Sequence, residues 1–147
     1  MKKFAIIALL AIVTTASATD FGIRAGRNTS GGLDNAGVVV DQKFGSFGAE
    51  ASFDRTAVKR STENKVGLLG TYDVATVFGT TVTAKAGGVI TEPKSAKAGA
   101  SVVAGVGLSY PVAKNVSVVA DYAYQFDKSR VSAFNGNTVS AGIKYSF

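Results

Sequence analysis

The amino-acid sequence predicts an all-β fold, an eight-stranded antiparallel up-and-down transmembrane β-barrel that follows a cleaved signal peptide. Two patterns predict the strands. Apolar and polar residues alternate with a period of two in segment after segment, and Gly, Asn, Asp and Ser interrupt them at regular spacing. A third observation concerns the membrane: no stretch after residue 18 approaches the roughly 20 apolar residues of a membrane helix. Such a chain can span a bilayer only as a closed barrel.

The N-terminus is typical of a secretory signal peptide. Lys2 and Lys3 precede an apolar run over residues 4–13, and the Ala-Ser-Ala of residues 16–18 is a small-x-small cleavage site. Because the run is too short to span a bilayer core, we expect cleavage rather than retention as an anchor helix. The predicted division is a signal peptide over 1–18 and one barrel domain over 19–147.

Eight strands are predicted, in the order 20–27, 36–44, 47–54, 66–74, 79–91, 100–110, 116–127 and 138–147. Six of them alternate clearly, with apolar faces formed in turn by Phe21, Ile23 and Ala25; Phe47, Ala49, Ala51 and Phe53; Val82, Ala84, Ala86 and Ile90; Val102, Ala104, Val106, Leu108 and Tyr110; Val116, Val118, Ala120, Tyr122, Tyr124 and Phe126; and Val139, Ala141, Ile143, Tyr145 and Phe147. The pattern lapses where Gln42, Gly70 and Gly88 fall on the apolar face, and where apolar residues fall on the polar one: Val39, Leu69, Val89, Val103 and Val119.

The connections between these strands alternate in length. Long polar connections are expected over 28–35, 55–65, 92–98 and 128–136, and short ones over 45–46, 75–77 and 111–115. With an even number of strands, all short turns lie at one end of the barrel and all long loops at the other.

The polar face of the strands has the composition of a closed interior. It is rich in glycine, whereas a sheet surface in water favours bulkier residues because glycine weakens a strand. Its charges also balance, with four cations, Arg24, Lys43, Lys85 and Lys144, and four carboxylates, Asp41, Glu50, Asp73 and Asp121. Buried charges occur in pairs, so we predict a charge network inside the barrel. Chance balance on a solvated face is the alternative.

Aromatic residues gather near the strand ends. Those predicted beside the short turns are Phe21, Phe44, Phe47, Phe78, Tyr110, Tyr145 and Phe147, and those near the long loops are Phe53, Tyr124 and Phe126. Two aromatic girdles around an apolar band are typical of a transmembrane barrel. The apolar face is therefore predicted to point toward lipid.

The stretches "VSAGIKYSF" (139–147) and "LSYPVAKNVSVVADYAYQF" (108–126), after a signal peptide and eight alternating strands, resemble the small bacterial outer-membrane β-barrel proteins. This group includes the barrel domain of outer-membrane protein A, outer-membrane protein X, the attachment-invasion proteins and the opacity proteins. The resemblance implies a location in the bacterial outer membrane with the long loops outside the cell. It also implies that Tyr145 and Phe147 form the C-terminal signal that the barrel-assembly machinery recognises.

Catalysis is not expected. The enzymes among outer-membrane barrels rely on a histidine, and this chain has neither His nor Cys, so the usual nucleophile and base pairs are absent. The carboxylates are dispersed among cations, which does not suit a metal site. No dinucleotide or P-loop glycine pattern occurs, so no cofactor is expected.

The long loops carry a basic cluster formed by Arg55, Lys59, Arg60, Lys65, Lys94, Lys97, Lys128 and Arg130. Such loops could bind phosphates of lipopolysaccharide, an acidic extracellular polymer or a host ligand. Ordinary solvated loop charge is the alternative. Nucleic acid is not an expected partner, because the loops contain almost no aromatic residue apart from Phe134.

The leading hypothesis is a non-enzymatic outer-membrane barrel with a structural or surface-interaction role in adhesion or in the cell envelope. A narrow porin-like channel is the first alternative, although an eight-stranded lumen is filled by side chains. A soluble periplasmic barrel that binds an apolar ligand in an apolar interior is the second. Solubility without detergent distinguishes the last from the others.

Overall fold

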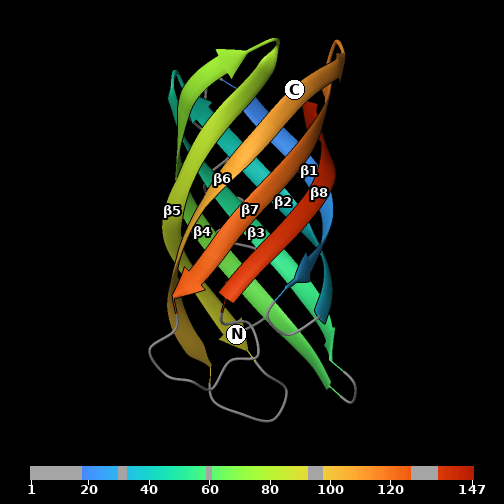
Figure 1. Cartoon of the computed structure of the whole chain (residues 1–147), viewed down its shortest axis with the longest axis vertical. Coiled ribbons are helices and arrows are strands. Elements are labelled where there is room, and N and C mark those ends of the chain that lie inside the picture. The colour runs from blue at the N-terminus through green and yellow to red at the C-terminus, as the bar shows by residue number, and fades with distance from the viewer. Residues whose placement is uncertain (1–17, 30–32, 59–60, 93–97, 127–135) are drawn as a thin grey trace.

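The computed structural model describes residues 18–29, 33–58, 61–92, 98–126 and 136–147, and these confirm the predicted fold. Eight antiparallel strands form one closed barrel, in which each strand pairs with its sequence neighbours and the first pairs with the last (Figure 1). The strands are β1 (Ala18–Asn28), β2 (Leu33–Phe44), β3 (Phe47–Val58), β4 (Ser61–Val77), β5 (Thr80–Glu92), β6 (Gly99–Ala113), β7 (Val116–Phe126) and β8 (Gly136–Ser146). Residues 1–17 lie outside the described residues, so the signal peptide stays a prediction.

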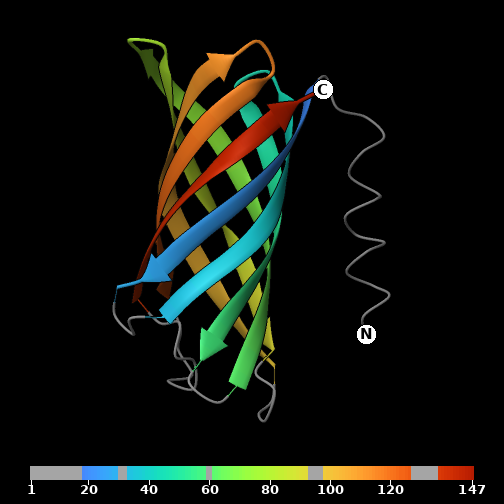
Figure 2. The same ribbon diagram turned by 90° about the vertical axis from the view of Figure 1, so that its right-hand side faces the viewer.

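The two ends of the barrel differ. The connections at 45–46, 78–79 and 114–115 lie together with the C-terminus at one end, which we call the short-turn end. The opposite end, where β1 joins β2, β3 joins β4, β5 joins β6 and β7 joins β8, is called the loop end. Figures 1 and 2 show strands that are strongly tilted against the long axis of the barrel. Strand tilt is what allows a sheet to close on itself.

Several predicted strand ends were wrong. The segment 55–65 was expected to be a long loop, but β3 and β4 continue through it, with Arg55 opposite Asn64 and Asp54 opposite Lys65. Its charged residues resemble a loop in composition, while the backbone retains its cross-strand pairing.

Two of the three short turns also lie later than predicted, while the turn at 45–46 lies where it was expected. The turn expected at 75–77 occurs at Phe78 and Gly79, whose φ angles of 50° and 78° are the positive values that a tight hairpin turn requires. Ala75–Val77 continue β4 after an irregularity in pairing between Asp73 and Ala75. In the same way, β6 runs through the expected turn at 111–115 as far as Ala113, with a register shift after Pro111.

The distribution of polar and apolar side chains is the inverse of that in a soluble protein. Polar side chains are buried inside the barrel, among them Glu50 at 0% exposure and Gln125 at 2%, while Ile23 and Val106 on the outer face are 58% and 45% exposed. The interior is thus not the apolar ligand cavity that a soluble barrel would need. An outer face of this kind matches a barrel surrounded by lipid.

The apolar residues that interrupted the polar face have a structural reason. Leu69, Val89 and Val103 point inward and pack together with Ala123 in a small apolar cluster. These residues fill part of the lumen that charged side chains do not occupy. The lapses in alternation therefore mark interior packing and not a change of strand face.

Candidate functional site

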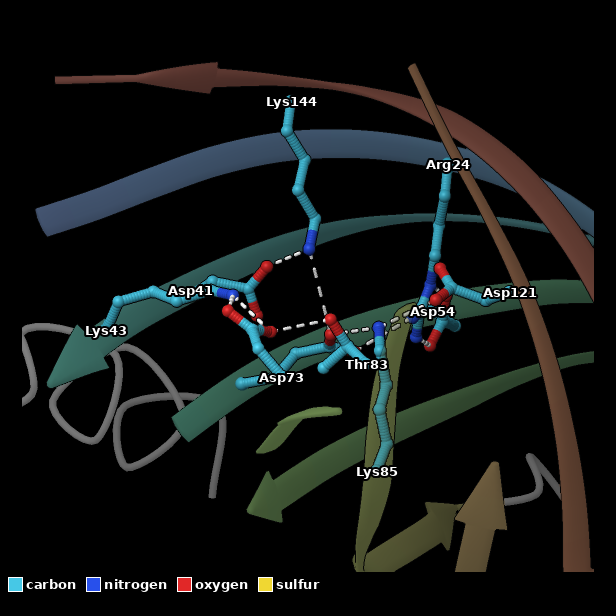
Figure 3. Close-up of polar contacts among 10 residues, drawn as sticks. Arg24, Asp41, Lys43, Asp54, Asp73, Thr83, Lys85, Asp121 and Lys144 are labelled. Atoms are coloured by element: carbon cyan, nitrogen blue, oxygen red, sulfur yellow. Dashed lines mark hydrogen bonds and ion pairs between the residues drawn. The ribbon is translucent and has the colours of Figure 1, made fainter. Parts of the chain in front are cut away.

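The centre of the barrel interior is a charge network around Glu50 on β3. Arg24 of β1 donates from Nη1 to Glu50 Oε1 at 3.2 Å, and Lys85 of β5 donates from Nζ to Glu50 Oε2 at 2.5 Å (Figure 3). Arg24 also binds Asp54 through two hydrogen bonds of 2.9 and 2.6 Å. Because Glu50 has no exposure, its charge is stable only through these cations.

Lys85 connects this group to the opposite wall. Its Nζ lies 2.7 Å from Asp121 Oδ1 on β7, so one ammonium joins two carboxylates across the lumen. Gly107 of β6 makes this possible, since a Cβ there would lie 2.6 Å from Asp121 Oδ1 and 2.8 Å from Lys85 Cε. Glycine on the inner face thus provides the space that the long charged side chains occupy.

A second polar group lies toward the short-turn end. Lys43 binds both carboxylate oxygens of Asp73 at 2.6 and 2.5 Å, and Thr83 donates to Asp73 Oδ1 at 2.7 Å. Lys144 of β8 donates to Asp41 and lies 3.9 Å from Glu50 Oε2, so Lys144 links Asp41 to the central network (Figure 3).

The structure therefore brings all eight interior charges of the sequence analysis into contact with partners: Arg24, Asp41, Lys43, Glu50, Asp73, Lys85, Asp121 and Lys144. Asp54 was missed as a member, although it follows Glu50 and Ser52 at a spacing of two. The expected balance of four against four was too simple, since Asp54, Asp20 and Lys65 also line the interior.

Two small cavities flank the central charges. One of about 100 Å³ on the short-turn side is lined by Asp20, Asp41 and Lys43, and one of about 50 Å³ on the loop side by Arg24, Asp54 and Lys65. Glu50, Lys85 and Asp121 line both. These three residues form a layer that separates the cavities, and each cavity has room for only a few water molecules.

The basic loop cluster is mostly outside the described residues, which include only Arg55 and Lys65 of its members. Neither of these two belongs to a loop. Arg55 lies on β3 with an exposed side chain on the outer face, whereas Lys65 lies on β4 and lines the loop-side cavity. The other members of the cluster lie outside the described residues: Lys59, Arg60, Lys94, Lys97, Lys128 and Arg130.

Aromatic side chains pair at both ends of the outer face. Phe47 packs against Tyr72 with ring centroids 4.8 Å apart, and Tyr145 packs against Phe147 at 5.1 Å, both at the short-turn end. Tyr124 and Phe126 form a corresponding pair at the loop end, at 4.6 Å. The backbone amide of Phe147 donates to the carbonyl of Thr19 at 3.0 Å, so this residue is joined to the first strand.

Within the described ranges, no group of three acidic, His or Cys side chains could hold a metal ion. No helix in that same part of the chain is long and apolar enough to cross a membrane.

Comparison with solved structures identifies the fold. Neisserial surface protein A superposes with a TM-score of 0.64 at 15% sequence identity, over 88% of this chain and 95% of that one. The Yersinia pestis outer membrane protein Ail gives 0.60 at 14%, over 88% and 99%, and a de novo designed transmembrane β-barrel gives 0.61 at 14%, over 91% and 98%. The fold is that of a small transmembrane β-barrel. No family model and no curated protein matches the sequence.

Proposed function

We propose that the chain is a non-enzymatic integral protein of the bacterial outer membrane, with a structural or surface-interaction role. The observation that carries this proposal is the inverted barrel, with paired charges inside and large apolar side chains such as Ile23, Val106 and Ile143 exposed outside. Exposed apolar surface on this scale is unfavourable in water, while lipid accepts it at no cost.

The structural neighbours support the location. Ail is described as an outer membrane protein and an attachment invasion locus protein, and the Neisserial neighbour as a surface protein. By this analogy the loop end would face outward among lipopolysaccharide, and the barrel-assembly machinery would recognise Tyr145 and Phe147. Fold-level analogy carries no specific ligand with it.

A surface role would use the connections at the loop end. Their basic residues, Lys59, Arg60, Lys94, Lys97, Lys128 and Arg130, are suited to an acidic extracellular polymer, a host ligand or lipopolysaccharide phosphates. The interior charges have another role, because carboxylates and cations that neutralise one another stabilise the barrel and are not free for acid–base chemistry.

The experiment that tests the proposal is folding of residues 19–147 from urea into detergent micelles and into phospholipid vesicles. We expect a β-rich species that requires detergent or lipid, runs on gels with heat-modifiable mobility, and stays with vesicles after a carbonate wash. A chain that folds to a stable, soluble β protein without amphiphile would contradict a membrane-spanning function.

A further inference from the structure

The cavity of about 100 Å³ on the short-turn side of the lumen, called the short-turn cavity below, opens toward that end of the barrel. Lys43 and Asp73 line its outer part, and their side chains are 28% and 24% exposed. Glu50, with no exposure, and Lys85, with a side chain 9% exposed, close its inner part. The cavity is therefore accessible to water and small ions from the short-turn end, and the central layer separates it from the loop side.

Carboxylates outnumber cations around this cavity. Among the described residues, five carboxylates line it, those of Asp20, Asp41, Glu50, Asp73 and Asp121. Three ammonium groups line it with them, those of Lys43, Lys85 and Lys144. Arg24 compensates Glu50 from the other side of the central layer. An excess of negative charge nevertheless remains on the short-turn side.

This excess lies between β1 and β2, where Asp20 and Asp41 are directly opposite each other in the register. Side chains in such a pair have Cβ atoms about 5 Å apart, and like charges there destabilise the sheet. No described residue forms an ion pair with Asp20. Asp41 is 5% exposed and binds Lys144 through Oδ2, while its Oδ1 is buried without a hydrogen-bond partner (Figure 3).

The chemistry of these two carboxylates suits a hydrated divalent cation. Mg²⁺ retains several of its waters and is bound in proteins through one or two carboxylates. Asp20 and Asp41 provide two, and the other ligands would be water, since the described ranges contain no group of three acidic side chains that could hold a metal ion. Hydroxyl groups of Thr71, Thr81 and Ser109 line the same cavity and are acceptors for the hydrogens of such waters.

We propose that the short-turn cavity binds one hydrated divalent cation of the Mg²⁺ class between Asp20 and Asp41 Oδ1. The ion enters from the water at the short-turn end, removes the repulsion between the two carboxylates and stabilises the pairing of β1 with β2. The site lies at the opposite end of the barrel from the basic loops, so this inference goes beyond the proposed surface role.

The test uses Mn²⁺ as the probe, because it shares the preference of Mg²⁺ for carboxylate and water ligands. The purified barrel is folded in micelles of a nonionic detergent, and free Mn²⁺ is measured by its electron paramagnetic resonance signal. We expect one Mn²⁺ bound per barrel, displaced by Mg²⁺ but not by Na⁺ at the same ionic strength. Binding of more than one equivalent, no binding, or equal displacement by Na⁺ would overturn the site.

Two variants assign the site to its residues. Asp20→Asn should weaken Mn²⁺ binding about tenfold or more, because a contact to a charged group is lost. Asp34→Asn is the matched control, since it removes an exposed carboxylate on β2 near the loop end and should leave the affinity unchanged. An Asp20→Asn barrel that binds Mn²⁺ as tightly as the unmodified one would refute the assignment.

Thermal stability separates an ion site from a purely structural role of Asp20. In a chelator, Asp20→Asn should unfold at the same temperature as the unmodified barrel or at a higher one, because the repulsion with Asp41 is gone. Added Mg²⁺ should then raise the unfolding temperature of the unmodified barrel only. Loss of stability in Asp20→Asn both with and without Mg²⁺ would contradict the proposal.

These outcomes are independent of the proposed function, because every measurement is made in micelles. Asp41→Asn provides a second test of the same site if Asp20→Asn does not fold, and it should also weaken Mn²⁺ binding. Failure of the unmodified chain to enter vesicles would contradict the membrane-spanning function and leave the result on the cation site as measured.

Discussion

Glu50 accepts hydrogen bonds from Arg24 and Lys85 at a position with no solvent exposure. Glu50→Gln keeps the size of the side chain but removes its charge, which leaves two buried cations without their shared carboxylate. We expect the free energy of unfolding to fall by about 3–5 kcal/mol, the range for breaking one partner out of a buried pair. Urea unfolding in lipid vesicles measures this free energy. Circular dichroism is the probe, because the chain contains no Trp for fluorescence.

Asp34→Asn is the matched control, because it also removes the carboxylate of an ion pair. Both side chains of that pair, Asp34 and Arg27, are exposed. Its effect should stay within about 1 kcal/mol, as for surface ion pairs. Equal effects of the two substitutions would mean that the interior network does not stabilise the barrel.

At the same scale, alternation in the sequence placed Arg24, Glu50 and Lys85 on the inner face but could not pair them. Arg24 meets Asp54 and Glu50 across one intervening strand, and Lys85 meets Asp121 across another. These contacts join strands that are not neighbours in the sheet, so no spacing along the chain encodes them. They depend on barrel tilt and closure, which only the three-dimensional structure supplies.

At the scale of the strand, the existence of all eight elements was predictable, whereas several of their ends were not. The charged composition of 55–65 indicated a loop. In the structure Thr56 is 1% exposed and faces inward like Asp54, two residues before it, so the inward-outward alternation of β3 continues into this segment. The turn at Phe78–Gly79 was missed because Phe78 favours strands, and its positive φ of 50° contradicts ordinary residue preference.

The strand scale also provides a test of the face assignment. Val106 is the central residue of β6, and its side chain is 45% exposed on the outer face. Val106→Arg should lower the free energy of unfolding in bilayers by about 2–4 kcal/mol, because the charge would lie near the bilayer midplane. Val77→Arg, at the short-turn end of β4, should cost only about 0–1 kcal/mol near the interface. Unfolding titrations that give the same cost for both would show that these residues do not face a bilayer.

At the scale of the whole molecule, the shared layer of Glu50, Lys85 and Asp121 divides the lumen into two cavities. The number of strands predicted a filled interior, and the pattern of the polar face predicted charges within it. The position of the layer that separates the two cavities could be found only from the structure. An eight-stranded barrel is narrow enough for side chains to close it.

The structure therefore predicts no sustained ion conductance. Planar-bilayer recordings of the refolded barrel should show no stable unitary steps, while Lys85→Ala, which removes the side chain joining two walls, should increase the frequency of brief openings. Stable unitary currents from the unmodified protein would favour the narrow channel over a structural role.

The pairing of β1 with β8 has a consequence for the order of events during synthesis. Hydrogen bonds between Thr29 and Asn137, and between Phe147 and Thr19, join residues that leave the ribosome more than a hundred positions apart. Until β8 is made, β1 and β7 each present an unpaired edge that could bind a neighbouring chain. Early strands thus cannot fold to completion one by one, and the nascent protein needs protection from self-association for the whole time that its sequence is being translated.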